Sequence, residues 1–262
     1  MRKYLIALAA ATIASSAYAV DMEIVKKIDV PVSEAASKIE IQGIKPGMKA
    51  ADAWEIFSKA YPSDAPEIQK FSITVHTNEV TSQPFEIAYD NNPGLNRDQL
   101  QVFLASPSVG GDVYGANRKI YYPAEKGYPQ ASAVLEQLEQ KYGKPSKVEK
   151  DEYNEGISAF WYVGGTGECG TSDVCDRVFN PRQIHSYVPK HFGHYINEMS
   201  FGPEVVVAAR IQHTIEKNGK AFSLDLSFLD LKRRGLSAES DTEQVKAAQK
   251  ALEEKPAALP EL

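Results

Sequence analysis

The chain lacks most of the features that assign a protein to a functional class directly. Beyond the first nineteen residues, no apolar stretch approaches the length of a membrane-spanning helix, so we expect no transmembrane segment. The G-x-S-x-G elbow, the S-x-x-K motif with its companions and the H-E-x-x-H pair are all absent. Basic residues are outnumbered by acidic residues, 29 to 35, and an acidic surface repels phosphate, which disfavours a nucleic-acid partner. No complete catalytic set is present, so we do not expect an enzyme.

The first nineteen residues have the organisation of a secretory signal peptide. Arg2 and Lys3 form a basic start, an apolar stretch follows, and the Ala-Tyr-Ala that ends at Ala19 matches a small-x-small cleavage site. We therefore expect cleavage after Ala19 and a periplasmic or secreted mature chain of about 243 residues. A buried N-terminal helix is the alternative. Loss of Arg2 and Lys3 leaves 27 of the 29 basic residues against 35 acidic ones, a net charge of −8.

Only two cysteines are present, Cys169 and Cys175, in the stretch ECGTSDVC. In an exported chain this spacing predicts a disulfide that closes a tight local loop and contributes about 2 kcal/mol. A redox-active pair is the alternative, but oxidoreductases favour C-x-x-C at the start of a helix, whereas five residues intervene here. The cysteines thus predict a local staple.

Two segments have the apolar periodicity of amphipathic helices, and each is followed by strand-like sequence. The stripe in segment 43–62, which ends at Pro62, consists of Ala50, Ala53, Trp54, Phe57 and Tyr61. The stripe in segment 128–145 consists of Ala131, Val134, Leu135, Leu138 and Tyr142. Gly143 suits a left-handed C-terminal cap, and Pro145 prevents continuation of the second helix.

Alternating sequence predicts strands at 71–77, 85–90, 98–106 and 113–122 after the first helix, and further strands after the second. Leu100, Val102 and Leu104 alternate with polar residues, as in a half-buried antiparallel strand. Asn218-Gly219 predicts a hairpin that pairs Val205–Ile215 with Ala221–Leu231.

Helix followed by sheet occurs twice, which predicts an α+β protein of two tandem units. We expect a first unit at 20–125, a second at 126–236, and a C-terminal helix and tail at 237–262. In the second unit an excursion at 164–203 carries the cysteine loop, and a segment so long inside a domain is usually functional or disordered. A capping box from Ser240 to Glu243 predicts the start of the C-terminal helix.

The IKPGM stretch before the first helix and the KYGKP exit of the second resemble a known α+β unit. They are similar to those of the secreted β-lactamase inhibitor protein and the small lipoprotein of the outer-membrane β-barrel assembly machine, within an uncharacterised family of bacterial secreted proteins. The resemblance covers about 40–235 as two copies. It implies binding of proteins through the open sheet surface and loops. The chain departs from both relatives in the 164–203 excursion and from the lipoprotein in lacking a lipid-attachment cysteine.

Three of the five histidines fall in HSYVPKHFGHY, residues 185–195, and suggest a metal site as the alternative function. If 190–199 is helical, His191, His194 and Glu198 share one face, and His185 lies six residues upstream of His191. Gly193 weakens such a helix. Loop histidines that pack around the cysteine staple or respond to pH are the other interpretations. A metal carrier or metal-dependent hydrolase would use these four residues.

The aromatic residues of the excursion are the candidate partner-binding residues, because tyrosine and other aromatics are favoured at protein interfaces. The sequence therefore favours an exported protein-binding module, such as an inhibitor, an immunity-type protein or an envelope accessory protein, with another envelope or secreted protein as partner. A purely structural envelope protein is a third class. The stretch Gly165–Gly170 matches G-x-G-x-x-G without the strand and helix that a dinucleotide site needs, so no cofactor is expected. The partner-binding candidates are Tyr187, Phe192, Tyr195 and Phe201.

Overall fold

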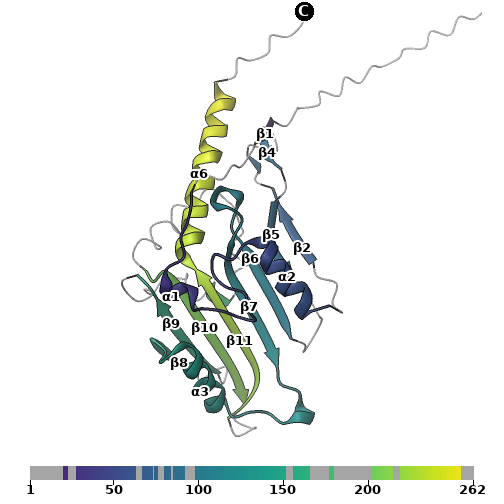
Figure 1. The fold of residues 1–262 in the computed structure, drawn as a ribbon, viewed down its shortest axis with the longest axis vertical. Helices are drawn as coiled ribbons and strands as arrows, with labels where there is room; N and C mark the ends of the chain where they lie inside the picture. The colour runs from purple at the N-terminus through teal and green to yellow at the C-terminus, as the bar shows by residue number, and fades with distance from the viewer. Residues whose placement is uncertain are drawn as a thin grey trace, which may run out of the picture.

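Eight strands form one antiparallel sheet in the order β2-β5-β6-β7-β11-β10-β9-β8 (Figure 1). The computed structural model describes residues 20–22, 28–62, 67–72, 74–75, 80–83, 85–91, 98–151, 156–165, 177–179, 202–214 and 219–254. The strands are β2 (Glu67–Phe71), β5 (Phe85–Asp90), β6 (Gln99–Leu104), β7 (Val113–Tyr121), β8 (Lys147–Asp151), β9 (Gly156–Val163), β10 (Val205–Thr214) and β11 (Lys220–Asp230). The helices are α1 (Glu34–Ser37), α2 (Ala50–Ala60), α3 (Ala131–Tyr142) and α6 (Leu231–Glu253). An antiparallel sheet with accompanying helices confirms the α+β class.

The two halves of the chain contribute four strands each to this continuous sheet. β2, β5, β6 and β7 occupy one half, β8 to β11 occupy the other, and β7 pairs with β11 at the centre. There Ile120 lies opposite Leu224 and Ala116 opposite Phe228. The predicted pairing of β10 with β11 is confirmed, with strand bounds within one residue of those expected. β9 extends the sheet from the other side of β10.

The strand expected at 71–77 has the wrong bounds. β2 begins at Glu67 and ends at Phe71, whereas Thr74–Val75 is β3 and belongs to a separate three-stranded sheet with β1 (Val20–Met22) and β4 (Val80–Ser82). Alternation identifies residues that suit a strand, but it does not show with which strand each segment pairs.

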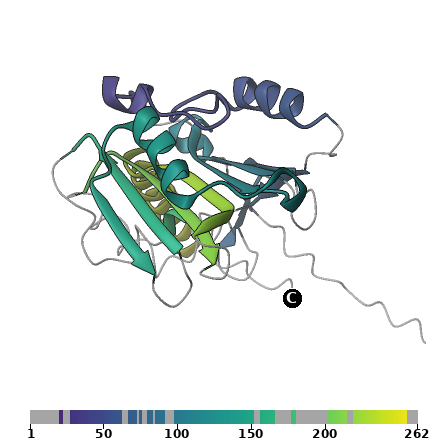
Figure 2. The same ribbon diagram turned by 90° about the horizontal axis from the view of Figure 1, so that it is seen from below.

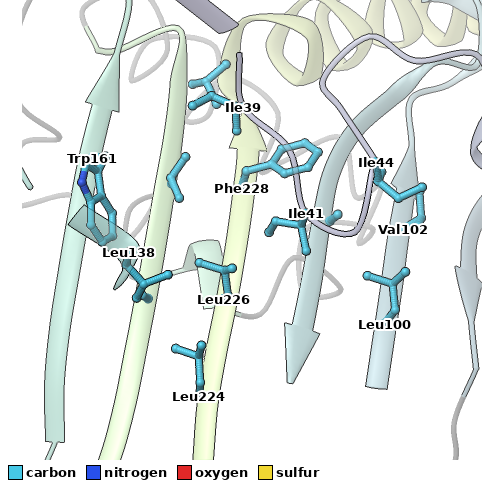
Figure 3. Packing of buried hydrophobic residues seen from close by; sticks show 14 of the residues in the cluster. Ile39, Ile41, Ile44, Leu100, Val102, Leu138, Trp161, Leu224, Leu226 and Phe228 are labelled. Carbon is cyan, nitrogen blue, oxygen red and sulfur yellow. The ribbon is translucent and has the colours of Figure 1, made fainter. Parts of the chain in front are cut away.

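One face of the sheet is covered by α2, α3 and the segment that leads into α2. Ala53 and Phe57 of α2 are buried, as are Val134 and Leu138 of α3, so both predicted helical stripes are confirmed. Figure 2 shows α1 and α2 on the same side of the sheet. Figure 3 shows how the core spans both halves of the chain, with side chains from the loop before α2, from α3 and from the central strands. The labelled residues are Ile39, Ile41, Ile44, Leu100, Val102, Leu138, Trp161, Leu224, Leu226 and Phe228.

The helix α3 ends as the sequence predicts, although not in the left-handed helical conformation. Gly143 has φ 82° and ψ −174°, a region that is essentially restricted to glycine. Its carbonyl accepts a hydrogen bond of 2.7 Å from Nε1 of Trp161, which ties the end of α3 to β9.

The opposite face of the sheet carries a second apolar cluster beneath α6. Phe103, Val206 and Leu229 are buried there together with Leu231 at the start of α6. The prediction that β6 is half-buried is therefore wrong at its end, where Phe103 is as inaccessible as Leu104. The sequence pattern of one strand cannot show that a helix distant in the chain covers its second face.

A buried arginine fastens α6 to the sheet and to the N-terminal segment. Arg233 is 1% exposed, and its guanidinium lies 3.3 Å from Asp112 and 3.5 Å from Asp230 and donates to the carbonyl of Val30. Gly47 packs against it, because a Cβ atom there would lie 2.8 Å from Nη2 of Arg233. Beyond Val245 the side chains of α6 are mostly exposed, where the helix runs past the end of the sheet in Figure 1. No helix in the described part of the chain is long and apolar enough to cross a membrane.

Candidate partner-binding face

The face of the sheet opposite α2 and α3 changes from apolar to polar along its strands. Beneath α6 it carries Phe103 and Leu229, and further along the same strands polar side chains occupy the same face, because side chains alternate between faces. The strand register places them in rows across β5, β6, β7, β11 and β10. We call this group the polar face. It comprises Asp90, Gln99, Gln101, Asn117, Lys119, Arg210, Asp225 and Ser227.

One row of the polar face carries charges of alternating sign. Lys119 lies opposite Asp225, and Asp225 lies opposite Arg210, so the carboxylate stands between two cations on adjacent strands. Cβ atoms of such cross-strand neighbours lie about 5 Å apart, close enough for opposite charges to attract. Gln99 continues the row beyond Lys119, and Ser158 continues it beyond Arg210.

Asp225 is held in place by an amide on the neighbouring strand. Nδ2 of Asn117 donates hydrogen bonds to Oδ1 of Asp225 and, at 2.7 Å, to Oγ of Ser227. Burial raises the pKa of Asp225, while the hydrogen bond from Asn117 and the charges of Lys119 and Arg210 act in the opposite direction. Asn117 and Ser227 are buried and Asp225 is half-buried, so the position of this acceptor is fixed by the sheet.

A second carboxylate on the polar face is held in the same manner. Asp90, which is 2% exposed, accepts hydrogen bonds from Nε2 of Gln99 at 3.2 Å and from Nε2 of Gln101 at 2.9 Å. Two glutamine side chains of β6 are thereby ordered by one aspartate of β5. Long side chains that are fixed before binding lose less conformational entropy when a partner docks.

The two cations of the polar face lie against aromatic rings. The Lys119 amine lies 5.2 Å from the ring centroid of Tyr121, and the Arg210 guanidinium lies 4.2 Å from that of Phe179. Arg210 is exposed and Lys119 is half-buried. Such stacking orients a cation while leaving its charge accessible.

Phe179 belongs to the 164–203 excursion, from which the sequence predicts partner binding. The short 3₁₀ helix η3 (Arg177–Phe179) contacts β10 and β11, Val178 is fully buried, and the ring of Phe179 lies 5.9 Å from that of Phe160. The described part of the excursion therefore lies on the same face of the sheet as Arg210.

The two ends of the excursion lie side by side. The amide of Glu204 donates to the carbonyl of Gly164 at 3.2 Å. Gly165 has φ 71°, and a Cβ atom there would lie 2.6 Å from the carbonyl oxygen of Gly202. Glycine at 165 permits this close approach, so the excursion leaves and rejoins the sheet at one point.

The charged groups of the polar face are held in place by their neighbours. Each of its two carboxylates is engaged by amide or cationic groups, and among the described residues no cluster of three His, Cys, Asp or Glu side chains could hold a metal ion. Toward solvent the face presents the exposed guanidinium of Arg210 and the half-buried side chains of Lys119 and Asp225, while Asn117 and Ser227 lie buried behind them.

The residues singled out from the sequence lie largely outside the described part of the chain. This holds for the cysteines, for the partner-binding candidates and for the metal-site candidates, which are Cys169, Cys175, Tyr187, Phe192, Tyr195, Phe201, His185, His191, His194 and Glu198.

The polar face was missed at the sequence level. Its signal is present in β11, where Asp225 and Ser227 alternate with apolar residues, and more weakly in β7, where Arg118 lies between Asn117 and Lys119. Only the pairing of β7 with β11 shows that the two alternations meet on one face.

No family model, no curated protein sequence and no solved structure matches this chain. The fold is that of an α+β protein built on one eight-stranded antiparallel sheet. The polar face lies on the side of this sheet opposite α2 and α3.

Proposed function

We propose that this protein is an exported, non-enzymatic protein-binding module that docks another envelope or secreted protein on its polar face. The observation that carries the proposal is the ordered charge row Lys119–Asp225–Arg210, which lies on the sheet surface beside the described part of the 164–203 excursion. An interface of this kind combines polar side chains of a sheet with an adjacent loop segment.

Physical reasons favour a macromolecular partner over a small ligand. The polar face extends over five strands, whereas small molecules bind in concave sites that bury most of their surface. Alternating charges at fixed spacing select a partner whose charges alternate in the opposite sense and penalise a mismatched one. The face therefore suits a specific protein surface.

The finer organisation that we propose is a tandem duplication, with a disulfide between Cys169 and Cys175 in the excursion. α2 precedes β2, β5, β6 and β7, and α3 precedes β8 to β11. From each edge of the eight-stranded sheet inward, the strands of each half follow in chain order, so within this sheet the two halves match strand by strand. This arrangement supports two tandem units, and export through the signal peptide would give the cysteines an oxidising compartment.

Affinity capture from envelope extract tests the polar face. We expect the variant Lys119→Glu/Arg210→Glu to capture at least about tenfold less of the partner than the wild type does, because two like-charge contacts replace two attractive ones. Deletion of the excursion should remove the same partner. The matched control is Lys45→Glu, a charge reversal at an exposed lysine on the segment before α2. Circular dichroism and thermal unfolding would confirm that each variant is folded.

A partner that survives both the charge reversal and the deletion would contradict the proposed interface. Loss of the same partner from the Lys45→Glu variant would show that capture depends on net charge and not on the polar face. Intact mass with alkylation before and after reduction checks the disulfide separately, since cysteines that alkylate without reduction are not paired.

A further inference from the structure

A pocket lies at the junction of the two halves, on the face of the sheet opposite the polar face. Its cavity volume is about 440 Å³. Tyr122 follows β7 and Val134 belongs to α3, and both belong to the core on the α2 and α3 side of the sheet. The remaining lining comes from the connection that includes the 3₁₀ helix η2 (Ala124–Lys126) and from exposed positions of α3. The lining residues are Tyr122, Lys126, Gly127, Tyr128, Pro129, Ala133, Val134 and Gln137.

The walls of this pocket are fixed by backbone hydrogen bonds to β11. The amide of Tyr122 donates to Phe222, and the carbonyl of Pro129 accepts at 2.8 Å from the amide of Ala221. The amide of Ala131, the first residue of α3, donates to the carbonyl of Gly219 at 3.0 Å. The connection between the halves is thus tied at both ends, so the pocket exists before any ligand arrives.

The lining combines rings with a few polar groups. Tyr122, Tyr128 and Pro129 are half-buried and line the pocket together with the buried Val134. Burial raises the pKa of Tyr122, so its hydroxyl stays protonated and can donate to a carbonyl oxygen. The amide of Gln137 adds a further donor at an exposed position.

The rim of the pocket is open and carries a positive charge. Lys126, Gly127, Ala133 and Gln137 are exposed, so a bound group would keep one side in solvent. Among the described residues, no carboxylate forms an ion pair with Lys126. Glu125 is its acidic neighbour in sequence, Glu136 precedes Gln137 on α3, and Lys220 lies across the backbone bridge from Gln130, so Lys126 is the charged lining residue among surroundings of both signs.

We propose that this pocket binds a proline-containing extended segment of a protein partner, with an acidic residue beside the proline. Proline-rich segments are ordered before binding, pack their rings between aromatic side chains and leave their carbonyl oxygens free to accept hydrogen bonds. Tyrosine rings, hydroxyl and amide donors and an open rim match these needs, and Lys126 matches the acidic residue. A small molecule would be enclosed more fully than this rim allows.

A titration followed by heteronuclear NMR on the full mature chain tests the proposal. The probe is the peptide acetyl-Ala-Pro-Pro-Pro-Glu-amide, and the comparison peptides replace the prolines by alanine or the glutamate by lysine. We expect shifts confined to the pocket residues and weaker binding for both comparison peptides. For the lysine peptide the loss should be about fivefold, which corresponds to an exposed ion pair of about 1 kcal/mol.

Two variants locate the site without disturbing the core. Ala133→Leu retains helix propensity at an exposed position of α3 and fills the pocket, so it should weaken binding by about tenfold or more. Lys126→Glu should reverse the preference, so that the lysine peptide binds better than the glutamate peptide. Lys45→Glu is the matched control and should bind like the wild type.

Several outcomes would overturn the proposal. The alanine peptide could bind as well as the proline peptide, Ala133→Leu could leave binding unchanged, or phenylacetate could occupy the pocket more tightly than the proline peptide, which would indicate a small-molecule site. Because the pocket and the polar face lie on opposite faces of the sheet, Lys119→Glu/Arg210→Glu should leave peptide binding unchanged, and the two proposals can fail separately.

Discussion

At the scale of single residues, three serine hydroxyl groups and one carboxylate form a buried cluster where α6 packs against residues 106–108. Ser106 Oγ donates to Oδ1 of Asp241 at 2.7 Å, and Ser237 Oγ accepts from the backbone amide of Ser106 at 3.1 Å. These side chains are buried, and Oδ2 of Asp241 has no hydrogen-bond partner among the described residues. Burial raises the pKa of Asp241 to about 6, although hydrogen bonds from Ser106 and Ser108 act against the rise. The ionised carboxylate is therefore costly here.

The raised pKa predicts a pH-dependent stability. Between about pH 4 and pH 6 the folded protein binds a proton at Asp241 that the unfolded chain does not, so this group stabilises the fold more as the pH falls through that window. The difference between the folded and unfolded pKa of Asp241 corresponds to at most about 3 kcal/mol in the free energy of unfolding. Asp241→Asn keeps the shape and removes the titration.

Urea unfolding at pH 5 and pH 7.5 measures this effect. Asp230 near Arg233 and Glu204 also has a pKa raised by burial to about 6, and it titrates in both proteins, so the comparison of wild type with Asp241→Asn isolates Asp241. We expect the gain in the free energy of unfolding at pH 5 to be larger for the wild type by about 1 to 1.5 kcal/mol, because pH 5 lies only about one unit below the folded pKa. Equal pH dependence in the two proteins would show that Asp241 does not titrate in this window.

At the scale of elements, the start of α6 is the clearest departure from the sequence-based expectation. The capping box predicts a helix that begins after Ser240, but α6 begins at Leu231. Asp230 immediately precedes it, and its Oδ1 accepts a hydrogen bond of 2.8 Å from the backbone amide of Arg233, which is the geometry of an N-terminal cap. Ser240 is buried within the helix, and its hydroxyl has no hydrogen-bond partner in the described part of the structure.

A pair of alanine substitutions distinguishes the two helix starts. Ser240→Ala should leave the free energy of unfolding unchanged or increase it, because it removes a buried hydroxyl without a partner. Asp230→Ala should lower it by at least about 1 kcal/mol, because the cap and a charge partner of Arg233 are lost. Chemical denaturation at pH 7.5 provides the measurement. A loss of about 1 kcal/mol in Ser240→Ala would instead support a cap at Ser240.

At the scale of the whole molecule, the two halves share one sheet and one core. β7 and β11 join the halves through backbone pairing, and Phe57 of the first half belongs to the same apolar cluster as Trp161 and Phe228 of the second. Separation of the two halves would expose the apolar residues that each half contributes to this cluster. A tandem origin is therefore compatible with halves that depend on each other for stability.

Fragments test this dependence. We expect residues 20–125 and residues 126–262, expressed separately, to show poor chemical-shift dispersion and no cooperative thermal transition, because each loses the β7–β11 pairing and half of its core. Mixing the two fragments should restore the chemical-shift dispersion and the cooperative thermal transition. Cooperative unfolding of either fragment alone as a monomer would show that the unit is an independent domain.

The sequence by itself determined α2, α3 and most strands of the eight-stranded sheet, because periodicity reports which side chains of one element face a core. The stripes of α2 and α3, the positive φ of Gly143 and the pairing of β10 with β11 all follow from local pattern. The tertiary structure alone decided what lies against the second face of the sheet. The position of α6, the contacts of Arg233 and the placement of Lys119 beside Asp225 depend on residues about a hundred positions apart, and no local periodicity encodes such register.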